Sequence, residues 1–264
     1  MTEQHPRVSG RILAVTNQKG GVGKTTTALN VATAIAVSGR RVLLVDVDPQ
    51  ANLTSGLGLK GQQAESGTIY EALTTNGEPD AFVLETPIEN LSLIPADRNL
   101  TGAEIELVPM PDRERRLQRI LSPLRSRFDY MFIDCPPSLG LLTLNALVAA
   151  DAVLIPLHCE YFALEGLADL VATMRRVRGV LNPALDIDGV LLTMYDDRTN
   201  LGQLVARDVR EFFKDKVFNT IIPRNVRLGE APSHGMPAVI YDSKSRGAAA
   251  YVALAKEMLD RHAA

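Results

Sequence analysis

Short apolar runs alternate with longer stretches of helical periodicity along most of the chain. Such runs, bounded by polar residues or glycine, are typical of buried parallel strands joined by crossover helices. Strands are predicted at 11–16, 41–46, 91–95, 130–134, 151–156, 187–194 and 217–222. Helices are predicted at 24–38, 68–73, 111–127, 140–150, 163–180, 199–213 and 247–261, with loops at about 48–67 and from 223 to about 245. The alternation predicts an α/β fold, a doubly wound and mostly parallel sheet flanked by helices on both faces.

Length and composition narrow the class of protein. The 264 residues suit a single domain over residues 11–264, preceded by a flexible tail at residues 1–10. Cys135 and Cys159 are the only cysteines, too few for a disulfide framework, and neither forms a C-x-x-C motif. No apolar run is long enough to span a membrane, and the first ten residues lack the apolar core of a signal peptide. A cytoplasmic protein without a membrane partner is expected.

The segment NQKGGVGKTT, residues 17–26, lies between the first predicted strand and the first predicted helix. Glycines allow successive backbone N–H groups to face one point, and the positive end of the helix dipole is directed at the same point. This context is typical of a phosphate-binding loop for ATP or ADP with Mg²⁺. Lys24 is expected on the β- and γ-phosphates, and the Thr25 hydroxyl on Mg²⁺. The predicted nucleotide-binding residues here are Gly20, Gly21, Val22, Gly23, Lys24, Thr25 and Thr26.

The loop departs from the usual G-x-x-x-x-G-K-[ST] pattern. Gln18 stands at the first glycine position, and a second lysine, Lys19, precedes Gly20. The string K-G-G-x-G-K-T resembles the deviant Walker A loop of the ParA/MinD group of ATPases. In that group the early lysine crosses a dimer interface to the partner's nucleotide. The resemblance therefore implies an ATP-bound homodimer with Lys19 and Lys24 as catalytic cations.

Carboxylates end two of the predicted strands. Asp46 and Asp48 are two residues apart, so they share a face of an extended strand end, where one would lie near the metal and the other could orient water. Asp134 ends the apolar run MFID, the Walker B pattern. The alternative is that these residues only cap backbone amides. The segment D-x-D-P-Q resembles the ParA switch, which implies that Asp48 positions the attacking water. The predicted metal residues are Thr25, Asp48 and Asp134.

The resemblance to ParA or Soj-type partition ATPases extends over residues 11–260 and includes the string DCPPSLGLLTLNA from Asp134. It implies that Met194 and Pro223 sandwich the adenine and that Asn225 reads its edge. Ordinary packing of strand ends is the alternative. The resemblance also implies slow ATP hydrolysis that a ParB-type partner stimulates. It further implies that the ATP dimer binds double-stranded DNA of the nucleoid without sequence preference, in chromosome or plasmid segregation.

Charge is unevenly distributed, which gives DNA binding a possible location. Residues 198–246 carry nine Lys and Arg against five Asp and Glu, a net charge of +4 in a chain whose total is −3. A local basic surface can bind phosphates where the whole protein would not. The alternative is a solvated helix face with ion pairs such as Arg207 to Glu211. The candidates, chosen because loops are predicted there, are Arg198, Arg224, Arg227 and Arg246. Arg175, Arg176 and Arg178 form a second basic cluster, which fits a solvated face or a partner-docking face equally well.

Three other classes of protein would require different sequence features. A MinD-like positioning ATPase needs a basic amphipathic C-terminal helix, whereas residues 248–264 are alanine-rich and balance Lys256 and Arg261 against Glu257 and Asp260. An iron–sulfur ATPase needs suitably placed cysteines, and both cysteines here are typical of buried small residues. A purely structural protein does not need Lys24, Asp48 and Asp134 together.

Overall fold

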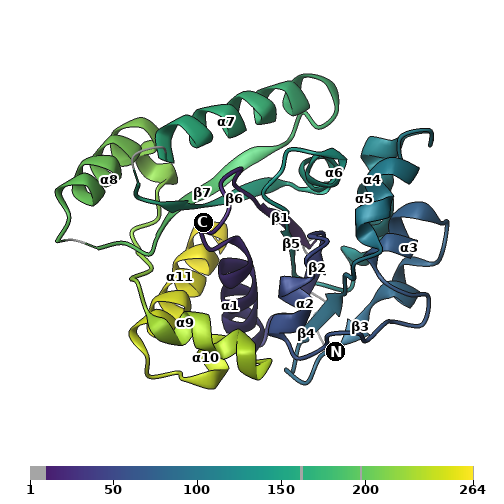
Figure 1. Ribbon diagram of the computed structural model, residues 1–264, viewed down its shortest axis with the longest axis horizontal. Helices are drawn as coiled ribbons and strands as arrows, with labels where there is room; N and C mark the ends of the chain where they lie inside the picture. Colours follow the sequence, from purple (N-terminus) through teal and green to yellow (C-terminus); the bar gives the residue numbers. More distant parts are fainter. Residues whose placement is uncertain (1–9, 161–162, 197, 264) are drawn as a thin grey trace, which may run out of the picture.

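The computed structural model describes residues 10–160, 163–196 and 198–263. Seven strands form one sheet in the order β3-β4-β2-β5-β1-β6-β7 (Figure 1). All neighbouring pairs are parallel except β3 with β4. The predicted doubly wound fold is therefore confirmed. The strands are β1 (Arg11–Val15), β2 (Val42–Asp46), β3 (Leu84–Glu85), β4 (Leu91–Ile94), β5 (Tyr130–Asp134), β6 (Ala152–His158) and β7 (Asp186–Thr193).

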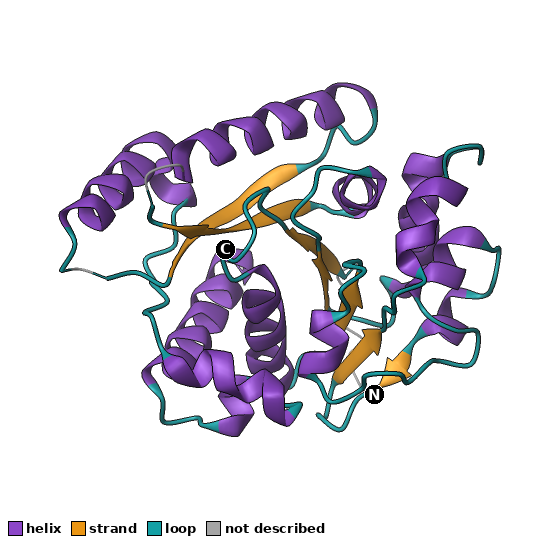
Figure 2. Cartoon of the chain, in the orientation of Figure 1, coloured by secondary structure: helices purple, strands orange, loops and turns teal. Residues whose placement is uncertain are grey.

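Helices cover both faces of the sheet (Figure 2). One face carries α1 (Lys24–Val37), α2 (Asn52–Gly56), α9 (Val226–Glu230), α10 (Ala238–Tyr241) and α11 (Arg246–Ala263). The other carries α3 (Ile69–Thr74), α4 (Leu100–Glu106), α5 (Arg116–Leu124), α6 (Leu141–Ala149), α7 (Ala163–Val180) and α8 (Asn200–Phe213). None of the helices in the described parts of the chain is long and apolar enough to cross a lipid bilayer.

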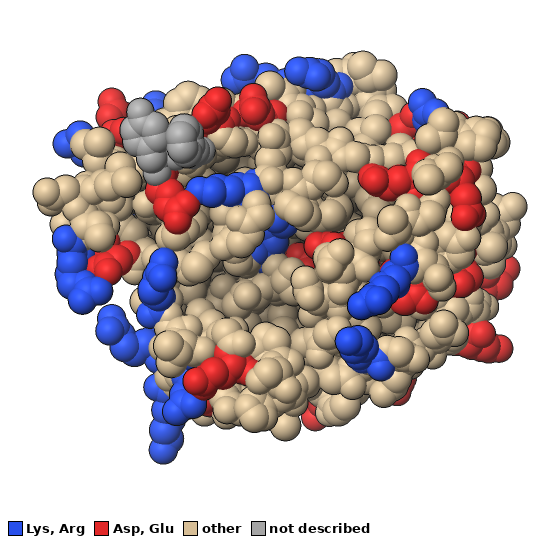
Figure 3. Space-filling model, in the orientation of Figure 1, with Lys and Arg blue, Asp and Glu red and all other residues tan. Residues whose placement is uncertain are grey.

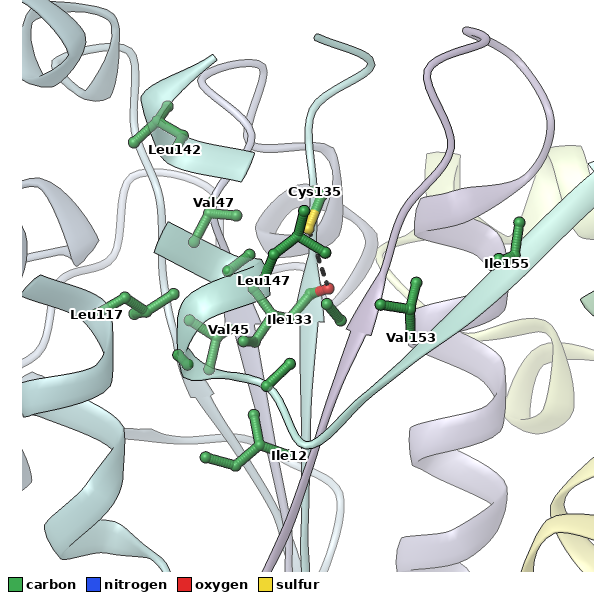
Figure 4. Close-up of a cluster of buried hydrophobic side chains, with 14 of the residues drawn as sticks. Ile12, Val45, Val47, Leu117, Ile133, Cys135, Leu142, Leu147, Val153 and Ile155 are labelled. Carbon is green, nitrogen blue, oxygen red and sulfur yellow. Dashed lines mark hydrogen bonds between the residues drawn. The ribbon is translucent and has the colours of Figure 1, made fainter. Parts of the chain in front are cut away.

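The strands divide their side chains between two hydrophobic cores, as the alternation of a strand requires. Leu13 and Val15 enter the core beneath α1 and α11, whereas Ile12 and Ala14 enter the core beneath the other helices. Figure 4 shows part of this second core. There the thiol of Cys135 lies 3.7 Å from the carbonyl oxygen of Ile133, a weak hydrogen bond. Burial raises the pKa of this thiol, which suits an inert core residue.

The prediction of a strand at residues 217–222 is wrong. Val217 and Pro223 form isolated bridges, to Val190 in β7 and to Tyr195 after the end of β7. Between them, the backbone N–H groups of Asn219 and Thr220 donate to the carboxylate of Glu257 on α11, at 2.8 and 2.9 Å. Because a side chain takes these donors, the segment follows β7 without a continuous ladder of hydrogen bonds.

Other differences concern boundaries and short elements. The helix predicted at 111–127 is reduced to α5, because a 3-10 turn at Arg113–Arg115 and Asp112, with φ +50°, precede it. The predicted loops contain α2, α9 and α10, which are too short to show helical periodicity. Of the tail predicted at 1–10, residues 1–9 lie outside the described residues. Gly10 is buried, and its N–H donates to the carbonyl of Arg125 at 3.0 Å.

Candidate active site

A cavity of about 540 Å³ opens beside the glycine-rich loop, where the strands have their carboxyl ends. Ligands of open α/β sheets bind at this edge. Six residues of the loop line the cavity: Gly20, Gly21, Gly23, Lys24, Thr25 and Thr26. Opposite the loop, the lining comes from the ends of β2 and β7 and from the segment that leads into α9. Sequence segments far apart in the chain therefore form one site, as expected for motifs that lie at the carboxyl ends of parallel strands.

The loop follows β1 and turns directly into α1. Gly21 and Gly23 have φ values of +72° and +87°, and Gly23 is the N-cap of α1. Side chains would strain these positions, so glycine lets the backbone curl towards the cavity. Val22 is buried and does not line the cavity, and its carbonyl accepts a 2.8 Å hydrogen bond from the hydroxyl of Thr193. The structure thus brings six of the seven predicted loop residues to the cavity and fixes the seventh behind them.

The two lysines of the loop lie in different surroundings. Lys24 lines the cavity, and its ammonium donates to the carbonyl of Lys19 at 3.2 Å. Burial lowers the pKa of Lys24, although the nearby Asp134 and Asp48 favour its charge. The side chain of Lys19 does not line the cavity and forms an ion pair with Glu160, which also contacts His158 at 2.9 Å. Of the two loop lysines, only Lys24 lines the cavity.

The two carboxylates that end β2 differ in their hydrogen bonds. Asp46 is fully buried, and its oxygens accept from the backbone N–H of Asp48 and from both the N–H and the hydroxyl of Thr54. Burial nevertheless raises the pKa of Asp46 to about 6. Asp48 lines the cavity and accepts from the backbone N–H of Gln50 at 2.9 Å. Asp46 thus braces the loop that presents Asp48.

Asp134 is fully buried at the end of β5, and neither of its carboxylate oxygens has a hydrogen-bond partner in the described structure. Burial and then the charge of Asp46 raise its pKa well above the ordinary value, while the Thr25 hydroxyl and Lys24 act in the opposite direction. A buried carboxylate without partners is costly unless a cation or donor is supplied. Oxygen ligands of this kind fit Mg²⁺, so Thr25, Asp48 and Asp134 suit the predicted metal.

The residues predicted for the adenine are only partly assembled. Met194, with φ +48°, and Asn225 line the cavity. The side-chain oxygen of Asn225 accepts from the backbone N–H of Arg227 at 2.9 Å and caps α9. Pro223 lies outside this lining and faces a neighbouring depression with Tyr195. The structure therefore does not place Met194 and Pro223 on opposite sides of one cavity.

Several lining residues were not predicted from the sequence. Gln50, Asn52 and Leu228 line the cavity, as does Arg224, which sequence reasoning assigned to DNA. Gln50 follows Asp48 by two residues, so its place could have been inferred from the strand end. Nothing local in the sequence indicates Leu228, because α9 approaches the loop only through the tertiary fold.

Two of the other candidate DNA residues, Arg198 and Arg227, are held by nearby acids. Arg198, whose side chain is 85% exposed, contacts Asp196 at 2.6 Å. Arg227 contacts Glu230 at 2.7 Å and Asp242 at 3.3 Å. Figure 3 shows basic groups gathered along the left edge, around α8 and α9. Arg246 begins α11, and Arg207 contacts its neighbour Asp208 at 3.8 Å.

Comparison with known proteins agrees with this geometry. A family model described as an AAA domain matches residues 10–187. The sporulation initiation inhibitor protein Soj of Bacillus subtilis is 56% identical over 249 residues, 94% of this chain and 98% of that protein. The chromosome-partitioning ATPase Soj of Treponema pallidum is 52% identical over 252 residues, 96% of this chain and 98% of that protein. The chain belongs to the ParA/Soj family of partition ATPases.

Some solved structures of similar proteins contain a bound nucleotide and magnesium. A cobyrinic acid a,c-diamide synthase from Mycobacterium smegmatis, solved with ADP and magnesium, is 40% identical, with a TM-score of 0.83 over 97% of this chain and 96% of that one. The cell division ATPase MinD of Pyrococcus furiosus is 28% identical, with a TM-score of 0.78 over 95% and 99%. The protein is an ATPase, and its cofactors are ATP or ADP and Mg²⁺.

Proposed function

We propose that this ParA/Soj-type ATPase is a switch that dimerises with ATP, binds DNA without sequence preference as the dimer, and releases it after hydrolysis. The observation that carries the proposal is the different placement of the two loop lysines. Lys24 faces the subunit's own cavity, whereas Lys19 lies outside the lining and pairs with Glu160. A cation that serves a second subunit has to lie outside its own nucleotide site.

The proposed roles follow from what each side chain contacts. Backbone amides of the loop and Lys24 hold the phosphates, and Thr25 with Asp134 holds Mg²⁺, as the unpartnered carboxylate of Asp134 supports. Asp48 lies near the metal and orients the water that attacks the γ-phosphate. Mg²⁺ supplies positive charge that stabilises the transferring phosphoryl group.

Lys19 is the proposed contribution of the opposite subunit. Its side chain is 35% exposed and sits at the edge of the loop, where a second molecule can reach it. A lysine that approaches the phosphates from a partner would stabilise transition-state charge as an arginine finger does. ATP would then hold the dimer together, and hydrolysis would release it. For this transfer the ion pair of Lys19 with Glu160 has to open.

DNA binding is proposed at Arg198, Arg224, Arg227 and Arg246. The excess of positive charge in residues 198–246 and the gathering of basic groups along one edge of the molecule support it. Arg224 also lines the nucleotide cavity, so it is placed to respond to the nucleotide state. Phosphate contacts carry no sequence information, so binding would be non-specific and dependent on salt.

Segregation of a chromosome or plasmid with a ParB-type partner is proposed on the names of the relatives, which include chromosome-partitioning proteins called ParA and Soj. The partner would stimulate hydrolysis, and nucleoid association would follow from DNA binding. This part of the proposal rests on family membership, because no described residue is assigned to the partner.

A MinD-like membrane ATPase is the rival within the same fold. Its interfacial helix would need an apolar face free for lipid and a basic polar face. In α11, Tyr251, Leu254 and Met258 are buried against the sheet and α1. Its last turns also carry both acidic and basic residues. The apolar face of α11 is used inside the protein, which favours DNA over membrane as the bound surface.

The proposal is tested by measuring mass in solution with a non-hydrolysable ATP analogue and with ADP. Wild type is expected to dimerise only with the analogue. Lys19→Ala should remain a monomer while still binding the analogue, and Arg176→Ala on α7 serves as a matched loss of one charge. A Lys19→Ala protein that dimerises like wild type would refute the role given to Lys19.

A further inference from the structure

A second cavity, of about 600 Å³, lies at the opposite end of the sheet from the nucleotide site. It is bordered by Arg11, the first residue of β1, and by Asp188 near the start of β7. The glycine-rich loop begins beyond the other end of β1, a strand of 5 residues that is about 16 Å long at the rise of a parallel strand. No described residue lines both cavities.

Basic residues outnumber acidic ones in the lining of this second cavity, although Asp186 and Glu257, outside the lining, pair with Lys216 and Arg261. Its lining contains five Lys and Arg residues against two Asp residues, a formal net charge of +3 in a chain whose total is −3. The cations come from three parts of the fold: β1, the end of α8 with the turn after it, and the last turn of α11. They are Arg11, Arg210, Lys214, Lys216 and Arg261.

Two of these cations are not neutralised. Arg210 and Lys214 form no ion pair with any residue in the described parts of the chain, whereas Lys216 contacts Asp186 at 2.9 Å. Arg261 donates to Glu257 and to the carbonyl oxygens of Asp215 and Val217, so it mainly holds the wall in place. Arg210 and Lys214 therefore remain free to bind an anion.

A buried network fixes the floor of the cavity. Asp188 has only 3% of its side chain exposed, and its Oδ1 accepts from Arg11 at 2.9 Å and lies 2.8 Å from Nε2 of His262. With Nε2 as donor, Nδ1 of His262 accepts from the hydroxyl of Tyr130 at 3.2 Å. The other oxygen of Asp188 and Nε of Arg11 are buried without partners. Arg11 is thus held at the border of the cavity, where 40% of its side chain is exposed.

The backbone at Lys214 gives an independent indication. This residue has φ +49° and ψ −118°, a region that glycine occupies without steric cost and lysine does not. Strain of this kind persists where the surrounding structure enforces it, often at functional sites. Here it places a lysine, instead of glycine, at the end of α8 and at the border of the cavity.

We infer that this cavity binds a small anion with two or more phosphate groups. The two cations that are unpaired among the described residues, Arg210 and Lys214, match two phosphate groups, with Arg11, which is shared with Asp188, beside them. The volume lies within the range of about 300–1,000 Å³ typical of small-molecule sites. Arg and Lys are the usual partners of such groups. Because the cavity is separate from the nucleotide site, the anion would bind in addition to the ATP or ADP of the ATPase cycle.

Inorganic pyrophosphate is the probe, titrated calorimetrically into protein saturated with ADP and Mg²⁺, at constant ionic strength. ADP occupies the phosphate loop, and free Mg²⁺ is matched in syringe and cell because pyrophosphate chelates it, so the remaining saturable heat reports the second cavity. The double variant Arg210→Gln with Lys214→Gln should bind at least about tenfold more weakly, as expected when two charge-assisted contacts are lost. The control double variant Arg176→Gln with Arg207→Gln removes the same charge elsewhere and should bind as wild type does.

Lys214→Gly tests whether weaker binding results from the lost charge or from misfolding. Glycine suits the observed φ, so the cation is removed without added backbone strain. It should unfold at a temperature no lower than wild type and still bind pyrophosphate several-fold more weakly. Equal affinities in all variants, absence of saturable heat, or release of ADP by pyrophosphate would each overturn the inference. Loss of duplex DNA binding in the Arg210/Lys214 variant, without saturable pyrophosphate binding in wild type, would assign the cavity to nucleic acid instead.

Discussion

Thr54 gives both its backbone N–H and its hydroxyl to one oxygen of Asp46, at 2.9 and 2.7 Å, and the same hydroxyl accepts from the N–H of Ala96 at 3.0 Å. One buried threonine thereby joins the end of β2, the helix α2 and the segment after β4. Asp46 in turn accepts from the backbone of Asp48, the residue proposed to orient water. The position of the segment that carries Asp48 therefore depends on the contact between Thr54 and Asp46.

Replacing Thr54 with valine should therefore be costly, because the shape is kept while Asp46 loses a donor and Ala96 an acceptor. We expect a loss of about 2–4 kcal/mol in the free energy of unfolding, measured with urea. Thr33→Val on α1 is the control. The hydroxyl of Thr33 donates only to the carbonyl of Leu29, in the preceding helical turn, and its loss should cost less than about 1 kcal/mol. Similar losses for both variants would contradict the bracing role.

Lys24→Met should weaken the binding of ADP without a large loss in the free energy of unfolding. Burial lowers the pKa of Lys24, which means that the folded protein disfavours its charge when no nucleotide is bound. The variant should bind ADP at least about 100-fold more weakly, while its unfolding free energy without nucleotide falls by no more than about 1 kcal/mol. Calorimetric titration and urea unfolding measure the two quantities. A large loss of stability without nucleotide would show that Lys24 is primarily a structural residue.

The interactions of Asp188 should make the free energy of unfolding fall as the pH falls below 3.8. Burial alone would raise the pKa of Asp188, but His262 and Arg11 outweigh it and leave the pKa below its ordinary value of 3.8. The unfolded chain therefore binds the proton more readily, so the stabilisation is present above pH 3.8 and is lost as the pH falls through the lower folded pKa. The carboxylate faces Arg11 and His262, with Tyr130 behind the histidine.

Asp188→Asn should lose about 1–3 kcal/mol at pH 7, since Arg11 is partly exposed and solvent screens its charge. Below pH 4 the difference from wild type should shrink, because wild type then loses the same interaction. Urea unfolding at pH 7, 5, 4 and 3 gives both curves. Parallel curves throughout this range would mean that Asp188 does not carry the acid sensitivity.

Arg227→Ala tests the proposed DNA face. The side chain is exposed and contacts only surface acids, so its loss should leave the fold intact. Binding of duplex DNA in the presence of ATP should weaken to a similar degree for different sequences, and the slope of log affinity against log salt should fall by about 1. Arg176→Ala on α7 is expected to leave that slope unchanged. An unchanged slope in Arg227→Ala would remove this residue from the interface.

Local motifs predicted the phosphate loop and the sheet, because their signals lie within a few adjacent residues. The strand predicted at 217–222 failed for a reason that no local pattern contains. Glu257, some 37 residues later, takes the backbone donors that a neighbouring strand would use. The expected pairing of Met194 with Pro223 around the adenine likewise depends on how the segment after Ile222 turns, which the sequence does not specify.

Asp46, the last residue of β2, and Asp48, two residues later, show the same limit of sequence-based prediction within the site. Their spacing predicts a shared face, but only the tertiary structure distinguishes Asp46, which is saturated with hydrogen bonds, from Asp48, which lines the cavity. Thr54, which makes that difference, lies in a segment predicted as a loop.

In the proposed function, the nucleotide state controls DNA binding through the dimer. The most direct measurement is the affinity of the wild-type protein for non-specific duplex DNA at fixed salt, first with ATP and then with ADP. Tight binding with ATP and its loss with ADP is the predicted result. Equal binding in the two states would separate the basic surface from the nucleotide cycle, and the absence of binding in both would contradict the proposed DNA function.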